Sequence, residues 1–418
     1  MITSKAKLIL LVACSLSLVS ASTVAQIDGL PLQEGVSLDA PVIASGLNFP
    51  VGLVVLPDGS LLVGSSNPTG GSYFSSTGEL LRFIDLNENG TFEEPPNVVA
   101  TDLAGMVTAV AVEGDLVFVT SAESRRERIQ ILRAPDDWAG PYQLLGEIRF
   151  DFRGFGHQSY GLATRPSASD PHAVELFFNI GASGNDSSGR AVPASGLLDA
   201  HLPDAALYMT TVTDEGAEIS LSEPVQIATG LRNAMAFGFH PKSGDLWITD
   251  NGIDGLEDVW TSYSADELNM IPADRIGGEA EDFGFPTTYT LYATGEIIGG
   301  EGILPIVAFV PVGSAENEGV ASMAFTPPTF TSVFGEGVIV GFHGQYDMWG
   351  SDNEENALLF VDLATSGVST LVPPGSPEVG HLNSVAAAGD AVYIADMCVG
   401  ASLAQSAPCG VLYRLEPA

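Results

Sequence analysis

Six stretches of this chain share one pattern: a glycine or polar opening, alternating apolar residues, a turn, and a second apolar run. The fullest copy is GLRNAMAFGFHPKSGDLWITDNG, over residues 230–252. It predicts a strand at Ala234–Phe239, a turn, and a second strand at Leu246–Thr249. The other copies begin at or near Gly46, Gly105, Gly156, Glu318 and Gly380.

The spacing between these copies is unequal, which excludes a solenoid, because solenoid repeats stack at one fixed period. The unequal spacing instead indicates repeated sheets whose outer strands and loops vary in length. Six such sheets around a channel form a β-propeller. The chain has 418 residues, and no Ser/Gly or Pro run divides it. We therefore expect an all-β, six-bladed β-propeller that forms a single domain over residues 26–418.

The N-terminus has the pattern of a secretory signal peptide over residues 1–25. Lys5 and Lys7 precede an apolar run from Leu8 to Val19. Small residues offer cleavage sites at Ala21 and Ala25. We expect a periplasmic or secreted protein.

A second interpretation of the same segment is a lipoprotein signal. Leu11 to Cys14 resembles a lipoprotein box, which would leave a lipidated Cys14, but the apolar run continues past the cysteine. Cleavage of an ordinary signal peptide is favoured. No later stretch is long and apolar enough to span a bilayer, so we expect no membrane insertion after signal removal.

Two cysteines remain after that cleavage, Cys398 and Cys409. They lie between the last two expected strands, Val392–Ile394 and Val411–Tyr413. An even count in an oxidising compartment favours a disulfide. A metal-binding pair is the weaker alternative, because neither a CxxC motif nor a nearby histidine accompanies them.

The chain is strongly acidic. Its formal net charge is −37, and it becomes −39 when Lys5 and Lys7 leave with the signal, which contains no Asp or Glu. Such a surface repels phosphate backbones and anionic lipids, so we expect no nucleic-acid partner and no docking to anionic membranes. The sequence leaves the oligomeric state open.

The segment Asp85–Gly90, DLNENG, has two interpretations. Its oxygen-bearing residues at the first, third and fifth positions, followed by glycine, have the spacing of a calcium loop. The acid expected at the twelfth position is replaced by Pro96. Asn-Gly between two strand-like runs also indicates a hairpin, which is the favoured interpretation.

Polar residues open several of the six repeats. Equivalent positions at the start of the innermost strands of a propeller converge on one mouth of its channel. The expected lining is Asn48 or Phe49, Val107 or Thr108, His157, Arg232, Asn233, Asn317 or Glu318, His381 and Asn383. A histidine beside a guanidinium and amides supplies a base and hydrogen-bond donors for an anionic or carbonyl-rich ligand.

These residues also carry a resemblance to a known family. GLRNAMAFGFHPKSGDLWITDNG, with Asp266-Glu267-Leu268-Asn269 and Asp282-Phe283-Gly284-Phe285-Pro286, closely resembles the soluble glucose/sorbosone dehydrogenases that depend on pyrroloquinoline quinone (PQQ). His157-Gln158-Ser159 and Val340-Gly341-Phe342-His343-Gly344 resemble the sorbosone branch. The resemblance extends from the first blade to the C-terminus.

The resemblance implies an oxidoreductase that acts on a carbohydrate or polyol, with PQQ and calcium as cofactors. His157 would be the base that takes the substrate hydroxyl proton. Arg232 and Asn233 would contact the quinone, with His381 and Asn383 as further cofactor contacts. Calcium would be held by the carbonyls of Gly252 and Ile253, and Glu267 falls where the family can place a second, structural calcium.

The sequence also departs from the family at its cofactor contacts. Gly156 stands where an acid precedes the histidine, and Val107-Thr108 stands at a polar contact in the second blade. Where basic residues hold the cofactor's carboxylates, this chain has Gly344-Gln345-Tyr346 and His381-Leu382-Asn383.

Two other classes of function stay open. A calcium-dependent lactonase or related hydrolase would use Glu318, Asn233 and Asn383 as ligands in the channel. The third class is an extracellular binding propeller without catalysis. Reduction of a dye by an aldose in the presence of quinone distinguishes the dehydrogenase from both.

Overall fold

The computed structural model describes residues 29–418, except for 69, 76, 87–91, 93–94, 124–125, 153–156, 158–159, 256–261, 312–317, 347 and 405–407. The expected signal over 1–25, with Cys14, lies outside the described residues. So do positions 87–90 of the Asp85–Gly90 segment, and both interpretations of that segment stay predictions.

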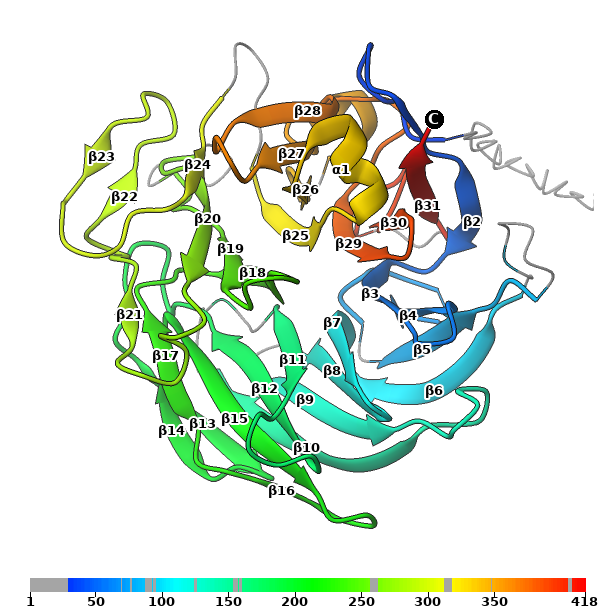
Figure 1. Cartoon of the computed structure of the whole chain (residues 1–418), viewed down its shortest axis with the longest axis vertical. Helices are drawn as coiled ribbons and strands as arrows, with labels where there is room; N and C mark the ends of the chain where they lie inside the picture. Colours follow the sequence, from blue (N-terminus) through cyan, green and yellow to red (C-terminus); the bar gives the residue numbers. More distant parts are fainter. Residues whose placement is uncertain are drawn as a thin grey trace, which may run out of the picture.

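Six of the seven sheets that the described strands form are arranged around a central axis, which confirms the expected six-bladed β-propeller; the seventh is a small two-stranded sheet (Figure 1). Each of the six sequence repeats leads into an innermost strand. These strands are β3 (Pro50–Val55), β7 (Met106–Glu113), β11 (Leu162–Pro166), β18 (Ala234–Phe239), β25 (Val320–Phe325) and β29 (Leu382–Ala388). Each contacts the next, and β29 contacts β3, so the ring is closed.

Three further strands extend each of the first five blades outward by antiparallel pairing. They are β4 (Leu61–Ser66), β5 (Thr77–Phe83) and β6 (Asn97–Ala104) in blade 1; β8 (Leu116–Glu123), β9 (Arg126–Arg133) and β10 (Gln143–Asp151) in blade 2; β12 (Ala173–Ile180), β15 (Ala206–Asp214) and β17 (Val225–Thr229) in blade 3; β19 (Leu246–Asp250), β20 (Asp266–Ile271) and β24 (Val307–Phe309) in blade 4; β26 (Gly337–Phe342), β27 (Leu358–Asp362) and β28 (Val368–Val372) in blade 5.

Blade 6 joins the two ends of the described chain. After β30 (Ala391–Asp396) and β31 (Gly410–Pro417), its outer edge is completed by β2 (Val42–Leu47) and β1 (Leu38–Asp39), which both pair with β31. Because the first strands of the chain pair with the last, the ring cannot open at this blade without breaking a sheet.

Smaller elements decorate the blades. The hairpin β13 (Ala191–Gly196) and β14 (Ala200–Pro203) leaves blade 3 and extends the outer edge of blade 2. The others are β16 (Ile219–Leu221), β21 (Glu281–Asp282), β22 (Tyr289–Thr290), β23 (Ile297–Ile298), helix α1 (Pro328–Phe334) and the short 3-10 helix η1 (Gly350–Asp352). In the described part of the chain, no helix is long and apolar enough to cross a membrane.

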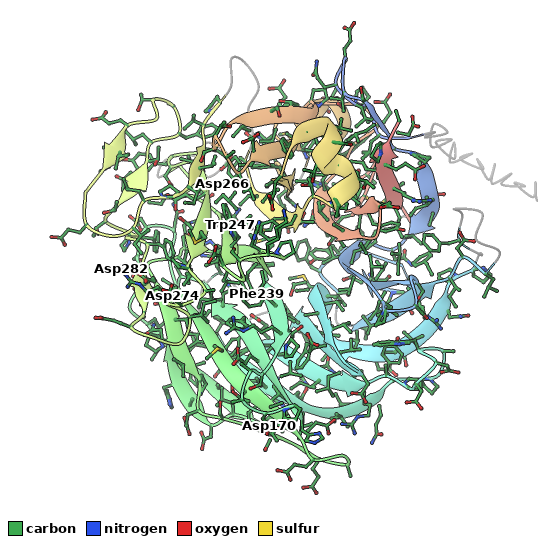
Figure 2. All side chains as sticks on the ribbon, viewed as in Figure 1. Asp170, Phe239, Trp247, Asp266, Asp274 and Asp282 are labelled. Atoms are coloured by element: carbon green, nitrogen blue, oxygen red, sulfur yellow. A yellow bond between two sulfur atoms is a disulfide. The ribbon has the colours of Figure 1, made fainter. Side chains whose placement is uncertain are left out.

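The core is a set of layers between neighbouring blades, and side chains fill these spaces (Figure 2). Between blades 2 and 3, Phe150 packs on Phe178, whose ring stacks on Tyr208 with centroids 5.7 Å apart. Every residue of β4 is buried, because blades cover it on both faces. Burial on both faces explains why this strand does not alternate between apolar and polar residues.

Two local predictions are confirmed at residue level. Strand β18 has the expected bounds Ala234–Phe239, and β19 extends the expected Leu246–Thr249 by one residue. Cys398 and Cys409 form a disulfide that closes the loop between β30 and β31.

Candidate functional site

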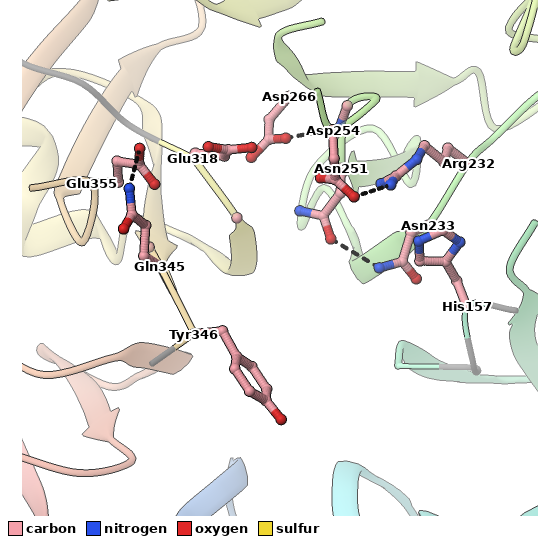
Figure 3. A pocket seen from close by; sticks show the side chains of 13 residues that line it. His157, Arg232, Asn233, Asn251, Asp254, Asp266, Glu318, Gln345, Tyr346 and Glu355 are labelled. Atoms are coloured by element: carbon pink, nitrogen blue, oxygen red, sulfur yellow. Dashed lines mark hydrogen bonds and ion pairs between the residues drawn. The ribbon is translucent and has the colours of Figure 1, made fainter. Parts of the chain in front are cut away.

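A cavity of about 290 Å³ opens at one mouth of the channel (Figure 3). Its walls come from the segments that precede the innermost strands and from the connections between the second and third strands of the blades. The lining residues are His157, Arg232, Asn233, Asn251, Gly252, Asp254, Asp266, Glu318, Gly319, Gly344, Gln345, Tyr346 and Glu355. Five predicted positions thus line one cavity: His157, Arg232, Asn233, Gly252 and Glu318.

The segment that carries Arg232 and Asn233 is held by a buried carboxylate. Asp250, at the end of β19, accepts the backbone N–H groups of Arg232 at 2.9 Å and Asn233 at 2.6 Å. Asp266, at the start of β20, acts in the same way between blades 4 and 5. It accepts the N–H groups of Gly252 at 2.8 Å and Val320 at 2.6 Å. Both carboxylates therefore position backbone at the mouth.

Burial is the main cause of unusual acidity constants in these two carboxylates. It raises the pKa of Asp250 to about 7 and that of Asp266 to about 6, against the lowering effect of the N–H donors. Each carboxyl stands close to the other, and this adds to the shift of Asp250. Removing them from water is therefore only partly offset by their hydrogen bonds.

The Arg232 side chain is 3% exposed, and its Nε and Nη2 atoms are hydrogen-bonded to neighbouring residues. Its Nη2 donates to Asp254 Oδ2 at 2.6 Å and to Asn185 Oδ1 at 2.7 Å, and its Nε donates to the Asn185 carbonyl at 2.9 Å. Asn185 belongs to the connection that follows β12. Neither Asn185 nor Asp254 was predictable from the sequence, because both lie in polar connections without periodicity.

His157 is oriented by the backbone of blade 3. Its ring Nδ1 lies 3.0 Å from the carbonyl of Ala182, and this acceptor requires Nδ1 to carry the hydrogen. Nε2 therefore carries the lone pair. Burial, followed by the nearby Arg232 charge, lowers the pKa of His157 to about 3, so the ring is neutral at physiological pH.

Ala182 also links His157 to Arg232. Its N–H donates to the Arg232 carbonyl at 2.7 Å, while its own carbonyl accepts the N–H of His157 at 2.8 Å. The relative position of the histidine and the guanidinium is thus set by backbone hydrogen bonds between blades 3 and 4.

Asn233 lines the cavity, and its side-chain amide is held by Asn251. Its Nδ2 donates to Asn251 Oδ1 at 2.9 Å, and Asn251 in turn donates to the Val320 carbonyl at 2.9 Å. Among the described residues, no hydrogen-bond partner meets Asn233 Oδ1, although the residue is only 6% exposed. An unpaired buried amide oxygen is costly to the folded state.

The cavity walls are acidic. Glu318 precedes β25, and Glu355 lies in the connection between β26 and β27, where it accepts a hydrogen bond from Gln345 Nε2 at 3.1 Å. Burial raises the pKa of Glu318 to about 9, and the neighbouring Asp266 carboxylate contributes to the shift. Among the described lining residues, Arg232 is the one cation, and it already pairs with Asp254.

A second cavity of about 180 Å³ adjoins the first and shares Asn233, Asn251, Gly319 and Tyr346 with it. We call it the aromatic cavity because Tyr73, Phe74, Tyr160 and Tyr346 line it together with smaller residues. The rings of Phe74 and Tyr346 lie 5.2 Å apart, and so do those of Tyr73 and Phe74. Phe74 is 44% exposed and Tyr346 is 40% exposed. Phe74 comes from the β4–β5 connection of blade 1 and Tyr346 from blade 5, so the contact bridges the mouth.

The predicted blade 6 residues lie in different places. Asn383 lines the aromatic cavity, and its Oδ1 lies 2.8 Å from His343 Nδ1. His381 is 0% exposed and stacks beneath His343, with ring centroids 4.4 Å apart. Burial, together with His343, holds the pKa of His381 well below its usual range, so it does not supply a cation at the mouth.

The remaining predicted lining positions are also distributed unevenly. Thr108 lines the aromatic cavity, whereas Phe49 and Val107 are buried in the core. Asn317 lies outside the described residues.

The three residues expected to bind calcium surround one small void. Gly252, Ile253 and Glu267 line a space of about 20 Å³, which is room for one water-sized occupant. The Ile253 carbonyl already accepts the N–H groups of Tyr263 and Ser264. Burial, with Asp250 close by, raises the pKa of Glu267 to about 8. Across the described residues, no three His, Cys, Asp or Glu side chains converge in a way that would hold a metal ion.

The lining chemistry does not fit the fully ionised PQQ tricarboxylate. Arg232, Asn233 and His157 supply donors suited to its quinone end. The other end meets Gln345, Tyr346 and the carboxyl groups of Glu318 and Glu355, and among the described lining residues it finds no second cation for its carboxylates. Buried anions need paired cations, and Arg232 is already paired.

Comparisons with known proteins agree with the fold. The sequence matches no protein-family model. A stretch of 63 residues is 40% identical to an uncharacterized protein of Borreliella burgdorferi, and it spans 15% of this chain and only 14% of that protein.

Similar solved structures span nearly the whole chain. The PQQ-bound aldose sugar dehydrogenase of Streptomyces coelicolor is 17% identical over 91% of this chain and 98% of its own, with a TM-score of 0.55. The holo PQQ domain of Coprinopsis cinerea pyranose dehydrogenase is 13% identical over 93% and 97%, with a TM-score of 0.60. Pseudomonas fluorescens PhoX in complex with vanadate is 10% identical over 93% and 96%, with a TM-score of 0.50. At these identities the likeness establishes the propeller fold.

Proposed function

We propose that this protein is a secreted or periplasmic enzyme that oxidises a carbohydrate or polyol at the channel mouth. The observation that carries the proposal is the convergence of His157, Arg232 and Asn233 in one cavity. The sugar dehydrogenases that share the fold support this class of reaction. The Cys398–Cys409 disulfide supports export to an oxidising compartment.

In this proposal His157 takes the proton of a substrate hydroxyl at Nε2. Its Nδ1–H stays on the Ala182 carbonyl, which keeps the ring in the accepting tautomer and stabilises the imidazolium that forms. The hydrogen on the same carbon leaves with two electrons to a quinone that serves as co-substrate. The Arg232 guanidinium would stabilise the negative charge of the reduced quinone.

The charge of the walls bears on the choice of quinone. PQQ is the acceptor that the sequence resemblance implies, and calcium near Gly252, Ile253 and Glu267 would supply part of the missing positive charge. An uncharged benzoquinone needs no such charge. We expect PQQ to bind only with calcium present.

The test is a titration of the purified protein with PQQ and with an uncharged benzoquinone, each with millimolar calcium and with chelator. An aldose panel with a redox dye reports turnover. We expect aldose-dependent dye reduction. We also expect calcium to raise the melting temperature, because an ion that binds only the native state stabilises that state. The dehydrogenase proposal would be wrong if the protein showed no dye reduction and no spectral change with either quinone.

A second candidate is a calcium-dependent lactonase or related hydrolase. The observation that favours it is that Glu318 and Asn233 share the main cavity, while Asn383 lines the adjoining one. Lactone or phosphoester cleavage that needs calcium and no quinone, and that Glu318→Gln abolishes, would support it. Binding without turnover in either assay would instead support a non-catalytic extracellular propeller.

A further inference from the structure

The aromatic cavity differs from the rest of this acidic protein in its charge. The chain carries 52 Asp and Glu residues against 15 Lys and Arg residues. Among the described residues that line the aromatic cavity, none is an aspartate, glutamate, lysine or arginine. His343 in its wall is neutral at physiological pH, because burial lowers the pKa of this ring. A cavity without charged side chains cannot pair with an ion, so it favours an uncharged occupant.

Two aromatic side chains of this cavity keep part of their surface open to a ligand. Phe74 and Tyr346 are both exposed, and their rings meet across the mouth with a tilt of 37°. The buried ring of Tyr73 packs edge-on against Phe74 and holds it in place. Aromatic faces of this kind bury the apolar face of another ring.

The polar edge of the cavity presents a hydrogen-bond acceptor beside a donor. His343 Nδ1 lies 2.8 Å from Asn383 Oδ1, and an amide oxygen only accepts, so Nδ1 carries the hydrogen. In the neutral ring Nε2 then holds the lone pair. Among the described residues, neither His343 Nε2 nor Asn383 Nδ2 has a hydrogen-bond partner, and neither is one of the fully buried unpaired atoms. Both atoms are therefore accessible in the cavity that these residues line.

This acceptor and donor distinguish between two kinds of uncharged ring. A hydroxyl group both donates and accepts, so the hydroxyls of a sugar can donate to His343 Nε2 and accept from Asn383 Nδ2. The carbonyl oxygens of a quinone only accept, and they would leave the lone pair of His343 unpaired. The cavity therefore suits a ring that has hydroxyl groups at its edge and an apolar face, which is the chemistry of a sugar.

The aromatic cavity is continuous with the cavity that His157 lines. The two have volumes of about 180 and 290 Å³. Four residues line both of them: Asn233, Asn251, Gly319 and Tyr346. A ligand longer than one ring can therefore occupy both cavities at once.

We propose that the aromatic cavity is a subsite for an uncharged sugar ring, and that the mouth binds a disaccharide or a longer oligosaccharide. One ring packs on Phe74 and Tyr346 and places its hydroxyls on His343 and Asn383. The next ring lies in the cavity of His157. The inference deepens the proposed function by naming the substrate class, and it rests on that function only for the oxidation that follows binding.

The experiment measures the binding of sugars to the full protein by titration calorimetry at neutral pH, with chelator present and no quinone. The probes are cellobiose, maltose, lactose and xylobiose, each compared with its constituent monosaccharides. We expect at least one disaccharide to bind about tenfold more tightly than its monosaccharides, or better, because it fills both cavities.

Variants assign this advantage to the aromatic cavity. Tyr346→Ala removes a ring face, and His343→Phe removes the acceptor but keeps a ring. We expect each to cancel most of the disaccharide advantage, since the second ring loses its packing surface or its hydrogen bond. Two matched controls outside both cavities should leave the advantage unchanged: Tyr263→Ala, at a similarly exposed tyrosine, and His201→Phe, at an exposed histidine of β14.

Melting temperatures show which variants are folded. Because Tyr346 is exposed, Tyr346→Ala should fold normally even if His343→Phe does not. Disaccharides that bind no more tightly than their monosaccharides would overturn the proposal, and so would an advantage that survives in every folded variant. Unchanged sugar binding in Tyr346→Ala, together with weaker binding of an uncharged benzoquinone, would make the cavity a quinone site instead.

The outcome is separate from that of the proposed function, because no turnover is measured. A disaccharide advantage without sugar oxidation would support the subsite and contradict the proposed function. Dye reduction by monosaccharides without a disaccharide advantage would support the proposed function and contradict the subsite.

Discussion

His157 and Arg232 line one cavity but have different hydrogen-bond partners. Hydrogen bonds through Ala182 set the position of both, and each side chain then has its own partner. The histidine keeps a lone pair at Nε2, whereas the guanidinium offers charge that Asp254 and Asn185 hold in place. Substitution of each residue should therefore affect different measured quantities.

Replacing His157 by Gln should lower turnover by about 10²–10⁴-fold, which is typical when a general base is lost, and leave quinone binding intact. Replacing Arg232 by Ala should also weaken quinone binding, because the guanidinium opposite the developing negative charge is gone. Steady-state kinetics and spectral titration measure the two effects. Equal turnover of wild type and His157→Gln would show that the histidine is not the base.

The connection between β30 and β31 supports the aromatic wall at the scale of a single element. The Cys398–Cys409 disulfide closes this connection, and Leu403 within it lines the aromatic cavity. The Leu403 carbonyl accepts the N–H of Tyr73 at 2.8 Å, and the Tyr73 hydroxyl donates to the Val107 carbonyl at 3.0 Å. Blades 1, 2 and 6 are thereby joined at the mouth.

Substituting both Cys398 and Cys409 by Ser should cost about 2–3 kcal/mol of stability, because the cross-link restricts a short loop in the unfolded chain. Loosening the support of Tyr73 should also weaken ligand binding at the aromatic cavity. Calorimetric melting and sugar titration check the two effects. An unchanged melting temperature would contradict the stabilising role, and unchanged sugar affinity would contradict the link to the site.

The whole molecule should respond to pH through its buried carboxyls. Burial raises the pKa of Asp266, Asp250 and Glu318 to about 6, 7 and 9, and each lies above the ordinary value. Each carboxyl contributes its full stabilisation below the pKa that it has in the unfolded chain. This contribution is lost as the pH rises through the pKa that the same carboxyl has in the folded protein. His157, lowered to about 3, acts oppositely and costs stability as pH falls below its unfolded value of 6.5.

We therefore expect the melting temperature of the ligand-free protein to fall between pH 6 and pH 9, a range set by these pKa values. Glu318→Gln should make the decline shallower above pH 7, because that group no longer titrates, whereas Glu296→Gln should leave it unchanged. Scanning calorimetry with chelator present makes the comparison. A melting temperature that rises across this interval would contradict the assignment of these carboxyls.

Much of the architecture was predictable because its signals are local and periodic. Alternation, turns and glycines recur in every repeat, so the six innermost strands, the bounds of β18 and the Cys398–Cys409 loop followed from the amino-acid order. Equivalence between repeats also predicted that His157, Arg232 and Asn233 meet, since the geometry of a ring imposes it.

The tertiary structure alone decided the chemistry around those residues. Asn185, Asp254 and Glu355 reach the mouth from connections with no repeat pattern, and only the packing of the blades determines where such a loop returns. His381 occupies an equivalent repeat position yet is buried beneath His343, because the side chain of a neighbouring blade covers it. Sequence periodicity specifies which strands line a channel, whereas the charge and shape of its mouth depend on contacts between residues far apart in the chain.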